Sequence, residues 1–395
     1  MNIKTSQDKN LANVTSYAGL RIYEDLWEKY NISRIIDSTF HKQSGKPLSS
    51  ILKNIFFGSL TDANSLNALS EIDKHDYFFN KNASLHRTNY SRNLGKLNDY
   101  GIQKVLDNIN IQIIKNKKIK DPILIYDPTA IQAEGKKYEK AKNIWDSSQE
   151  KVIRGYELNK LLLNDGKHNF PINFRLQDKS KPTIINQFKL AGRIYNTNKA
   201  VFDAGIRGMP FFKELEEEGF LFYTKATCNW YFNLGKDYTI TELQKKYRSL
   251  VKRNKILSRT AYKDDMKLRL IFVDGENDVY LTNDFDCKLE KVVEIYYRRW
   301  NVEISFREEK QELGLDILPS RKLKKIKVHF MLVLIAYLLS QFILEKRKIF
   351  NIAQGIKKIK RFIINTWAII KVTAKTKLEF NTRFKRDWIF DLDYG

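Results

Sequence analysis

Cysteine is scarce in this chain, which has only Cys228 and Cys287 among its 395 residues. Two cysteines exclude a disulfide framework and a zinc site built on thiolates. The first ten residues, MNIKTSQDKN, also lack the apolar segment that follows the basic residue of a secretory signal. We therefore expect a cytoplasmic protein in a reducing compartment.

Long apolar runs are also few, and the strongest extends from Val328 to Leu344. Its length is close to the minimum that spans a bilayer, but His329, Ser340 and Gln341 interrupt it. The run is more typical of a buried core helix than of a membrane span, so we expect no membrane association.

Acidic residues are too few to balance the basic ones: 46 Asp and Glu face 70 Lys and Arg, a net charge of +24. Such an excess favours a polyanionic partner, either nucleic acid or an anionic membrane surface. The basic residues are spread along the chain, so the positive surface belongs to the fold. Only the region 346–395 is more strongly basic, and its role stays open between DNA binding and pairing of subunits.

The pattern of apolar residues divides the chain into three parts. Residues 1–117 have helical periodicity and are predicted to form a DNA-binding domain. Within them, His86–Leu97 is polar and basic ahead of an apolar helix. It is either the recognition helix of a helix-turn-helix unit or a capped surface helix in a small bundle.

Residues 118–345 are predicted to form an α/β domain. Its order is three strands, helix, strand, helix and strand, followed by short strands and turns at about 228–288. If the first three strands form an antiparallel meander and the fourth pairs parallel with the first, the strand ends at Asp127 and Asp203 meet. The predicted strands and helices, in chain order, are the strands Pro122–Thr129, Lys151–Leu163 and Phe170–Leu176, the helix Pro182–Tyr195, the strand Ala200–Asp203, the helix Pro210–Glu218 and the strand Phe220–Thr227.

The segment Leu289–Leu313 contains no Gly or Pro and is predicted to be one continuous helix. At about 100° per residue it has one apolar stripe and, beside it, one polar stripe. The polar stripe is either a functional edge or a solvated face with ordinary i,i+4 ion pairs. The apolar stripe is Ile295, Val302, Phe306 and Leu313, and the polar stripe is Tyr296, Arg299, Glu303 and Lys310.

Three carboxylates, Asp127, Asp203 and Glu303, are placed so that a helix packed on the sheet would bring them together. Clustered carboxylates repel one another unless a cation joins them. Oxygen ligands without Cys or His suit Mg²⁺ or Mn²⁺. Two such ions can activate a water molecule and stabilise the leaving oxygen of a phosphodiester.

These residues resemble a known family. The pattern Tyr296-x2-Arg299-x3-Glu303-x6-Lys310 is similar to the Tyr–Arg–Glu–Lys motif of DDE transposases from bacterial insertion sequences, in the insertion-sequence-four group. Asp127, within YDPT, resembles the first acid of that family, and Asp203-Ala204-Gly205 resembles the second. The resemblance covers about 120–344.

The resemblance implies a ribonuclease-H-like core, a mixed five-stranded sheet flanked by helices and interrupted by a mostly β insertion. It implies two Mg²⁺ or Mn²⁺ ions bound by the three acids. Tyr296, Arg299 and Lys310 would contact DNA phosphates. Trp230 would stack on a flipped base, or instead pack as a core aromatic, and Trp300 is expected to pack.

The resemblance further implies a transposase that cuts terminal inverted repeats and joins the 3′ ends to target DNA. We expect a homodimer on DNA, in the bacterial cytoplasm and at the nucleoid when bound. The alternatives are a non-catalytic DNA-binding protein of transposase descent and a metal-dependent nuclease without strand transfer.

Overall fold

The computed structural model describes residues 14–61, 63, 65–117, 119–176, 181–203, 208–349, 351–366, 368–372 and 378–382. The chain forms two compact units. One unit joins Met1–Val105 with Glu308–Gly395, and the other is Leu106–Arg307. This division differs from the three parts predicted from the sequence. Those parts were defined by expected function, and their functions stay predictions.

The unit Leu106–Arg307 is built on a mixed sheet, which has eleven strands within the described residues. The strand order is β3-β4-β2-β6-β7-β12-β11-β10-β8-β9, and β5 also pairs with β4. The strands are β2 (Ile123–Gln132), β3 (Lys142–Asp146), β4 (Lys151–Asn164), β5 (Asn169–Leu176), β6 (Lys199–Phe202), β7 (Leu221–Lys225), β8 (Tyr231–Asn233), β9 (Asp237–Thr239), β10 (Ile256–Lys263), β11 (Met266–Val273) and β12 (Val279–Thr282).

The predicted strand topology is confirmed where it matters for the acids. Strands β2, β4 and β5 are antiparallel neighbours, and β6 pairs parallel with β2. The sheet is larger than the five strands predicted for two reasons. The short strand β3 was not expected, and β12 pairs with β7, so that strands of the insertion continue the sheet.

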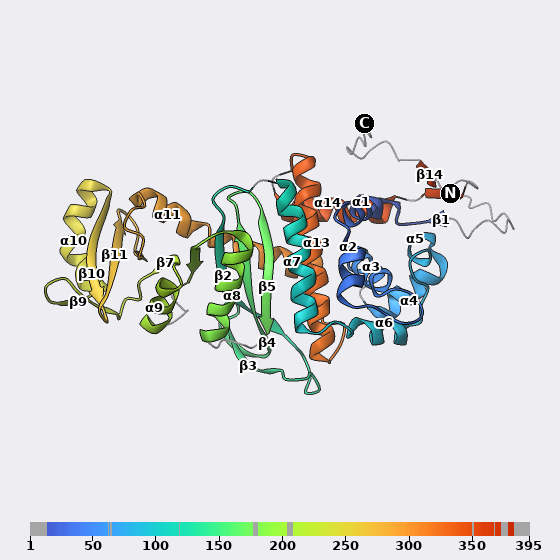
Figure 1. The fold of residues 1–395 in the computed structure, drawn as a ribbon, viewed down its shortest axis with the longest axis horizontal. Coiled ribbons are helices and arrows are strands. Elements are labelled where there is room, and N and C mark those ends of the chain that lie inside the picture. The colour runs from blue at the N-terminus through green and yellow to red at the C-terminus, as the bar shows by residue number, and fades with distance from the viewer. Residues whose placement is uncertain are drawn as a thin grey trace. The chain divides into compact units, whose positions relative to one another are not determined.

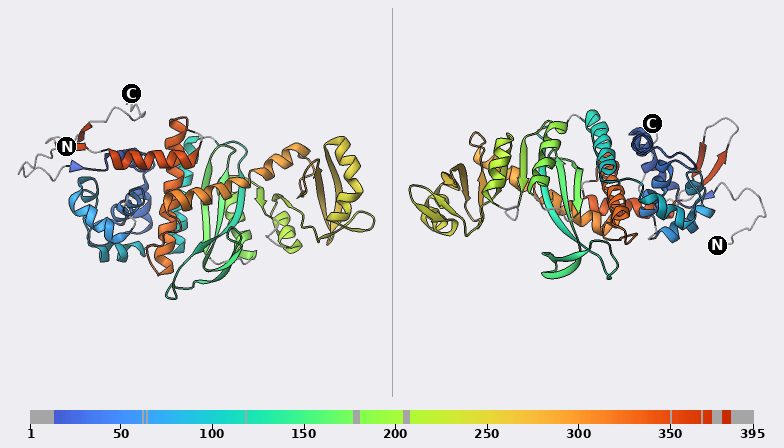
Figure 2. Two further views of the ribbon diagram at one scale, coloured as in Figure 1. Left: turned by 180° about the vertical axis from the view of Figure 1, so that it is seen from behind. Right: turned by 60° about the horizontal axis from the view of Figure 1, so that its bottom comes forward.

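Helices cover both faces of this sheet. Figure 1 shows α8 (Lys181–Tyr195) in front of β2, and the reverse view in Figure 2 shows α11 (Leu289–Tyr297) on the far side. Helix α8 packs through Phe188, whose ring centre lies 6.2 Å from that of Tyr126 and 6.4 Å from that of Phe202. Apolar residues along β2 and β6 therefore form the core beneath α8. Helix α9 (Met209–Glu217) contacts β7.

The region 228–288 contains one element that was not predicted, the helix α10 (Ile240–Asn254). Thr239 caps it: its hydroxyl accepts from the backbone N–H of Glu242, whose side chain accepts from the backbone N–H of Thr239. This capping box is a helix signal that can be read from the sequence. The insertion is therefore rich in strands but also contains a helix of four turns.

The prediction of one continuous helix over Leu289–Leu313 is wrong, because a turn at Arg298–Arg299 separates α11 from α12 (Trp300–Leu313). At the turn the backbone bonds tighten to i−3: the N–H of Arg299 donates to the carbonyl of Tyr296 over 2.9 Å. The predicted apolar stripe is nevertheless buried on both sides of the turn, with at most 4% exposure.

The unit Met1–Val105 with Glu308–Gly395 is mainly helical. Helix α13 (Leu323–Lys346), predicted to be a core helix, is long and apolar enough to cross a membrane, but 94% of its most apolar window is buried. Its Ser340 hydroxyl lies 2.7 Å from the hydroxyl of Tyr23. The elements are β1 (Val14–Thr15), η2 (Ala18–Leu20), α1 (Arg21–Lys29), α2 (Ile32–Thr39), α3 (Leu48–Ser59), α4 (Leu66–His75), α5 (Tyr77–Asn80), α6 (Arg87–Leu94), α13 (Leu323–Lys346), α14 (Ile352–Asn365), β13 (Ala368–Val372) and β14 (Leu378–Thr382).

Helix α7 (Asp99–Lys117) and helix α12 each run across a boundary between the units.

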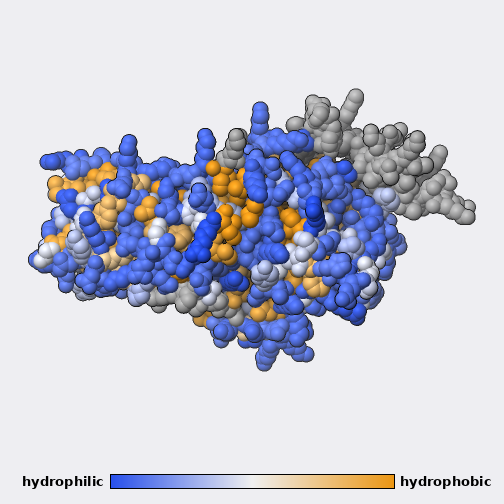
Figure 3. Space-filling model, in the orientation of Figure 1, coloured by the Kyte–Doolittle hydropathy of each residue, from blue (hydrophilic) through white to orange (hydrophobic). Residues whose placement is uncertain are grey.

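On the visible face, hydrophilic residues cover most of the surface (Figure 3), in keeping with the charge of the chain.

Candidate functional site

Two of the three predicted acids lie on neighbouring strands. Asp127 is part of β2, and Asp203 directly follows β6. The parallel register pairs Tyr126 with Phe202, so the next residue of each strand, Asp127 and Asp203, comes at the same level of the sheet. Asp203 is half-buried, and the Ala204-Gly205 part of the predicted motif lies outside the described residues.

Arg299, at the turn between α11 and α12, lies between the third predicted acid, Glu303, and Asp127. The guanidinium Nη1 of Arg299 lies 2.5 Å from Glu303 Oε1 and 3.8 Å from Asp127 Oδ1. The hydroxyl of Tyr296 donates to Asp203 Oδ1 over 3.4 Å. The predicted residues Asp127, Asp203, Tyr296, Arg299 and Glu303 therefore share one site within the unit Leu106–Arg307.

The charges of this site are shielded from water unevenly. The side chain of Asp127 is 14% exposed and that of Glu303 is 34% exposed. Burial, together with the charges of Glu303 and Asp203, raises the pKa of Asp127 to about 7, although Arg299 opposes the shift. Among the described residues, Arg299 Nε has no hydrogen-bond partner. The site thus combines a buried carboxylate with a guanidinium that has a donor to spare for an anion.

Lys160 is a charged neighbour of the site that sequence reasoning missed. It pairs with Asp127 across the antiparallel strands β4 and β2, and it is fully buried. Its ammonium donates to the hydroxyl of Ser305 over 2.6 Å and lies 3.9 Å from the ring centre of Phe306. A lysine within the run LNKLLL is the sequence signal, because a strand buried on both faces rarely carries a charge without a partner.

The donor types suit a hard divalent cation, since Asp127, Asp203 and Glu303 offer carboxylate oxygens only. In the part of the chain that the structure describes, no group of three metal-ligating side chains is gathered at binding separation. The guanidinium of Arg299 is the counter-charge between Asp127 and Glu303 in this arrangement. The residues therefore fit Mg²⁺ or Mn²⁺ by chemistry, with Arg299 between two of the three ligands.

Three other predicted residues are not part of this group. Lys310 belongs to the other unit, where it lines a cavity of about 120 Å³. Trp230 is half-buried, with its ring 5.8 Å from that of Phe212 in an edge-to-face contact, so its packing role is present and its DNA role stays a prediction. The expectation that Trp300 packs is wrong, because 56% of it is exposed at the start of α12.

The fold and the site together define a mixed α/β protein with acidic residues on two neighbouring parallel strands, Asp127 within β2 and Asp203 directly after β6. Residues 118–339 match the family model of the transposase DDE domain. This match covers more than half of the chain, which therefore belongs to the family of transposase DDE domains. No curated protein matches the chain.

Proposed function

We propose that the chain is an active transposase of a bacterial insertion sequence. It binds the terminal inverted repeats, hydrolyses the DNA at the ends and joins the freed 3′ ends to target DNA. The observation that supports this most is the parallel pairing of β2 with β6, which places Asp127 level with Asp203. Arg299 lies between Asp127 and Glu303, which supports a ribonuclease-H-like site built from the three acids.

In this proposal Asp127, Asp203 and Glu303 hold two Mg²⁺ or Mn²⁺ ions. When bound, such ions supply an activated water and stabilise the leaving oxygen. Tyr296 and Arg299 border the acids and would hold the phosphate of the cleaved strand, with Lys310 as a further phosphate contact. The buried ammonium of Lys160 adds positive potential beside Asp127.

The proposal includes two ends brought together by a homodimer on DNA, in the cytoplasm and at the nucleoid. The alternatives are a DNA-binding protein without catalysis and a nuclease that hydrolyses without joining. The presence of all three acids favours catalysis over a DNA-binding protein without catalysis. Binding alone does not require three mutually repelling carboxylates, Asp127, Asp203 and Glu303.

The three possibilities differ in their products. The purified chain is incubated in Mg²⁺ with a plasmid that carries its gene and native flanks, together with a second plasmid as target. We expect cuts at two defined flanking positions and 3′ ends joined to the target, both lost when EDTA removes the metal. Cuts without joined products would favour a nuclease, and specific binding without cuts would favour the non-catalytic protein.

A further inference from the structure

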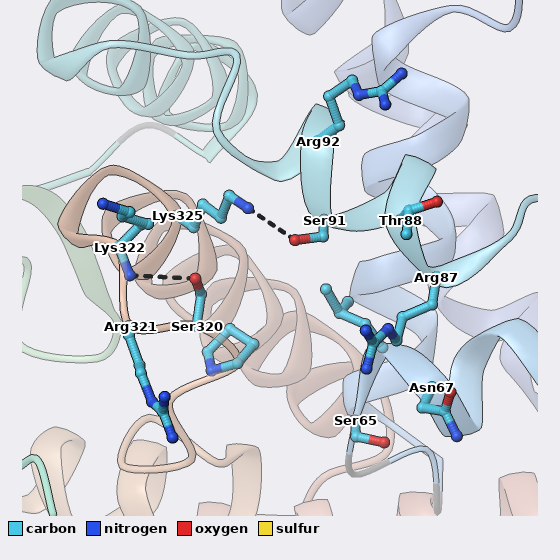
Figure 4. A pocket seen from close by; sticks show the side chains of 12 residues that line it. Ser65, Asn67, Arg87, Thr88, Ser91, Arg92, Ser320, Arg321, Lys322 and Lys325 are labelled. Atoms are coloured by element: carbon cyan, nitrogen blue, oxygen red, sulfur yellow. Dashed lines mark hydrogen bonds between the residues drawn. The ribbon is translucent and has the colours of Figure 1, made fainter. Parts of the chain in front are cut away.

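A large basic cavity lies in the unit Met1–Val105 with Glu308–Gly395. It measures about 760 Å³ and is walled by the start of α4, by α6 and by the segment that leads into α13 (Figure 4). None of the residues that line it is acidic. The five cationic residues that line it, named here the basic cavity cluster, are Arg87, Arg92, Arg321, Lys322 and Lys325.

The basic cavity cluster carries five positive charges. Within the described residues none of them forms an ion pair, and the ammonium of Lys325 donates to the neutral hydroxyl of Ser91 over 2.7 Å. Elsewhere in the same unit, Lys53 and Lys81 both pair with Glu24. Uncompensated like charges in one cavity repel one another, so a bound polyanion would stabilise this region.

The cavity also has the neutral donors and the shape of a phosphate site. Hydroxyls of Ser65, Thr88, Ser91 and Ser320 lie among the cations (Figure 4). Helix α13 begins beside them with no side-chain cap, so the positive end of its dipole adds to the potential. Four of the five cations are exposed, and only Lys325 is partly buried.

The volume lies in the range of sites that accept a ligand of several groups, about 300–1,000 Å³. A single phosphate would leave most of the cations without a contact, whereas a phosphodiester chain offers one charge at every step. Contacts to phosphates set the position of a protein on a duplex and do not read its bases.

We infer that the basic cavity cluster binds the sugar–phosphate backbone of duplex DNA and holds it independently of base sequence. The choice of DNA rests on the proposed function, while the cavity itself does not involve the acids. The residues of α6 thus contact phosphates from one wall, and Arg321, Lys322 and Lys325 contact them from the other.

The test is the affinity of the full chain for a short DNA duplex of arbitrary sequence, measured by fluorescence anisotropy in EDTA at several salt concentrations. The variant Arg321→Gln/Lys322→Gln is compared with Lys29→Gln/Lys104→Gln, which removes two exposed charges of the same unit outside the cavity. A second variant, Arg87→Gln/Arg92→Gln, changes the opposite wall. Urea unfolding checks that each variant is folded.

We expect both cavity variants to weaken binding by about tenfold and to lower the slope of log affinity against log salt by about 2, since each lost phosphate contact removes about 0.9. The Lys29/Lys104 variant should bind within twofold of the wild type. Equal weakening in all three variants, or in none, would overturn the site. Equal affinity for a duplex RNA of the same length would overturn the assignment to DNA. Because EDTA prevents cleavage, a failure here is distinct from a failure of the proposed catalysis.

Discussion

Single residues of this protein owe their properties to burial in specific surroundings. Asp127 and Lys160 face each other across β2 and β4, where Lys160 is fully buried and the side chain of Asp127 is 14% exposed. The sequence marked Asp127 because it ends an apolar run. Lys160 is visible in the sequence as a lysine within a run of leucines, but the run does not show which residue lies beside it. Only the pairing of the strands supplies that partner.

His329 on α13 gives a residue-scale prediction of pH dependence. Its ring Nε2 lies 3.0 Å from the carbonyl oxygen of Gly314, and burial lowers its pKa to about 4. The unfolded chain takes up this proton near pH 6.5 and the folded chain only near pH 4. Neutral His329 therefore makes its full contribution to the unfolding free energy above pH 6.5. This contribution is lost as the pH drops toward 4.

The variant His329→Gln should remove this contribution, so that its unfolding free energy falls by about 2 kcal/mol less than that of the wild type between pH 7 and pH 5. Urea titrations at the two pH values measure the difference. His41→Gln is the control, because His41 is exposed. A wild-type pH dependence in His329→Gln would contradict a neutral buried histidine.

At the scale of elements, most strands and helices of the α/β part could be predicted from apolar runs and their Gly and Pro boundaries. Strand β2 was predicted only as far as Thr129, with Pro128 inside it. Strand β2 continues through Pro128 to Gln132. Its pairing with β6 stops at Tyr126, so beyond that point β2 pairs with β4 alone. A proline, which has no backbone N–H to donate, is tolerated where a strand has a neighbour on one side only.

The turn at Arg298–Arg299 could not be predicted in this way, because no Gly or Pro marks it and the apolar stripe continues through it. Helix α10 could have been found from its capping box. The turn does not separate the predicted residues, because Tyr296 still contacts Asp203 and Arg299 still lies between Asp127 and Glu303.

Helix α14 gives a prediction at this scale through Gly355. Gly→Ala inside a helix normally stabilises by about 1 kcal/mol. Here a Cβ would lie 2.4 Å from Cδ2 of Leu344, which is only 1% exposed and cannot move away freely. Gly355→Ala should therefore destabilise the protein by about 1–3 kcal/mol. Urea unfolding measures this, with Gln354→Ala, an exposed neighbour, as a control within about 0.5 kcal/mol. A stabilised Gly355→Ala would show that α14 does not pack closely on α13.

At the scale of the whole molecule, the sequence predicted a helical N-terminal part but not its assembly with the C-terminal part. Tyr23 bonds Ser340 and β1 pairs with β13, although hundreds of residues separate these segments. Periodicity describes which face of a helix is apolar and carries no information about which distant helix covers that face. The basic cavity cluster was missed for the same reason, since its two walls come from segments about 230 residues apart.

We propose that Asp127, Asp203 and Glu303 form one metal-dependent catalytic site. The most direct test is the rate of cleavage at the ends of the native flanks in Mg²⁺ for Asp127→Asn, Asp203→Asn and Glu303→Gln. Glu294→Gln on α11 is the matched control, because Glu294 is exposed and pairs with Lys291 and Arg298. Each of the three variants should bind the ends but lose at least about 100-fold in rate, while the control keeps its rate. A wild-type cleavage rate in any one of the three variants would remove that residue from the site and contradict a catalytic site made of three acids.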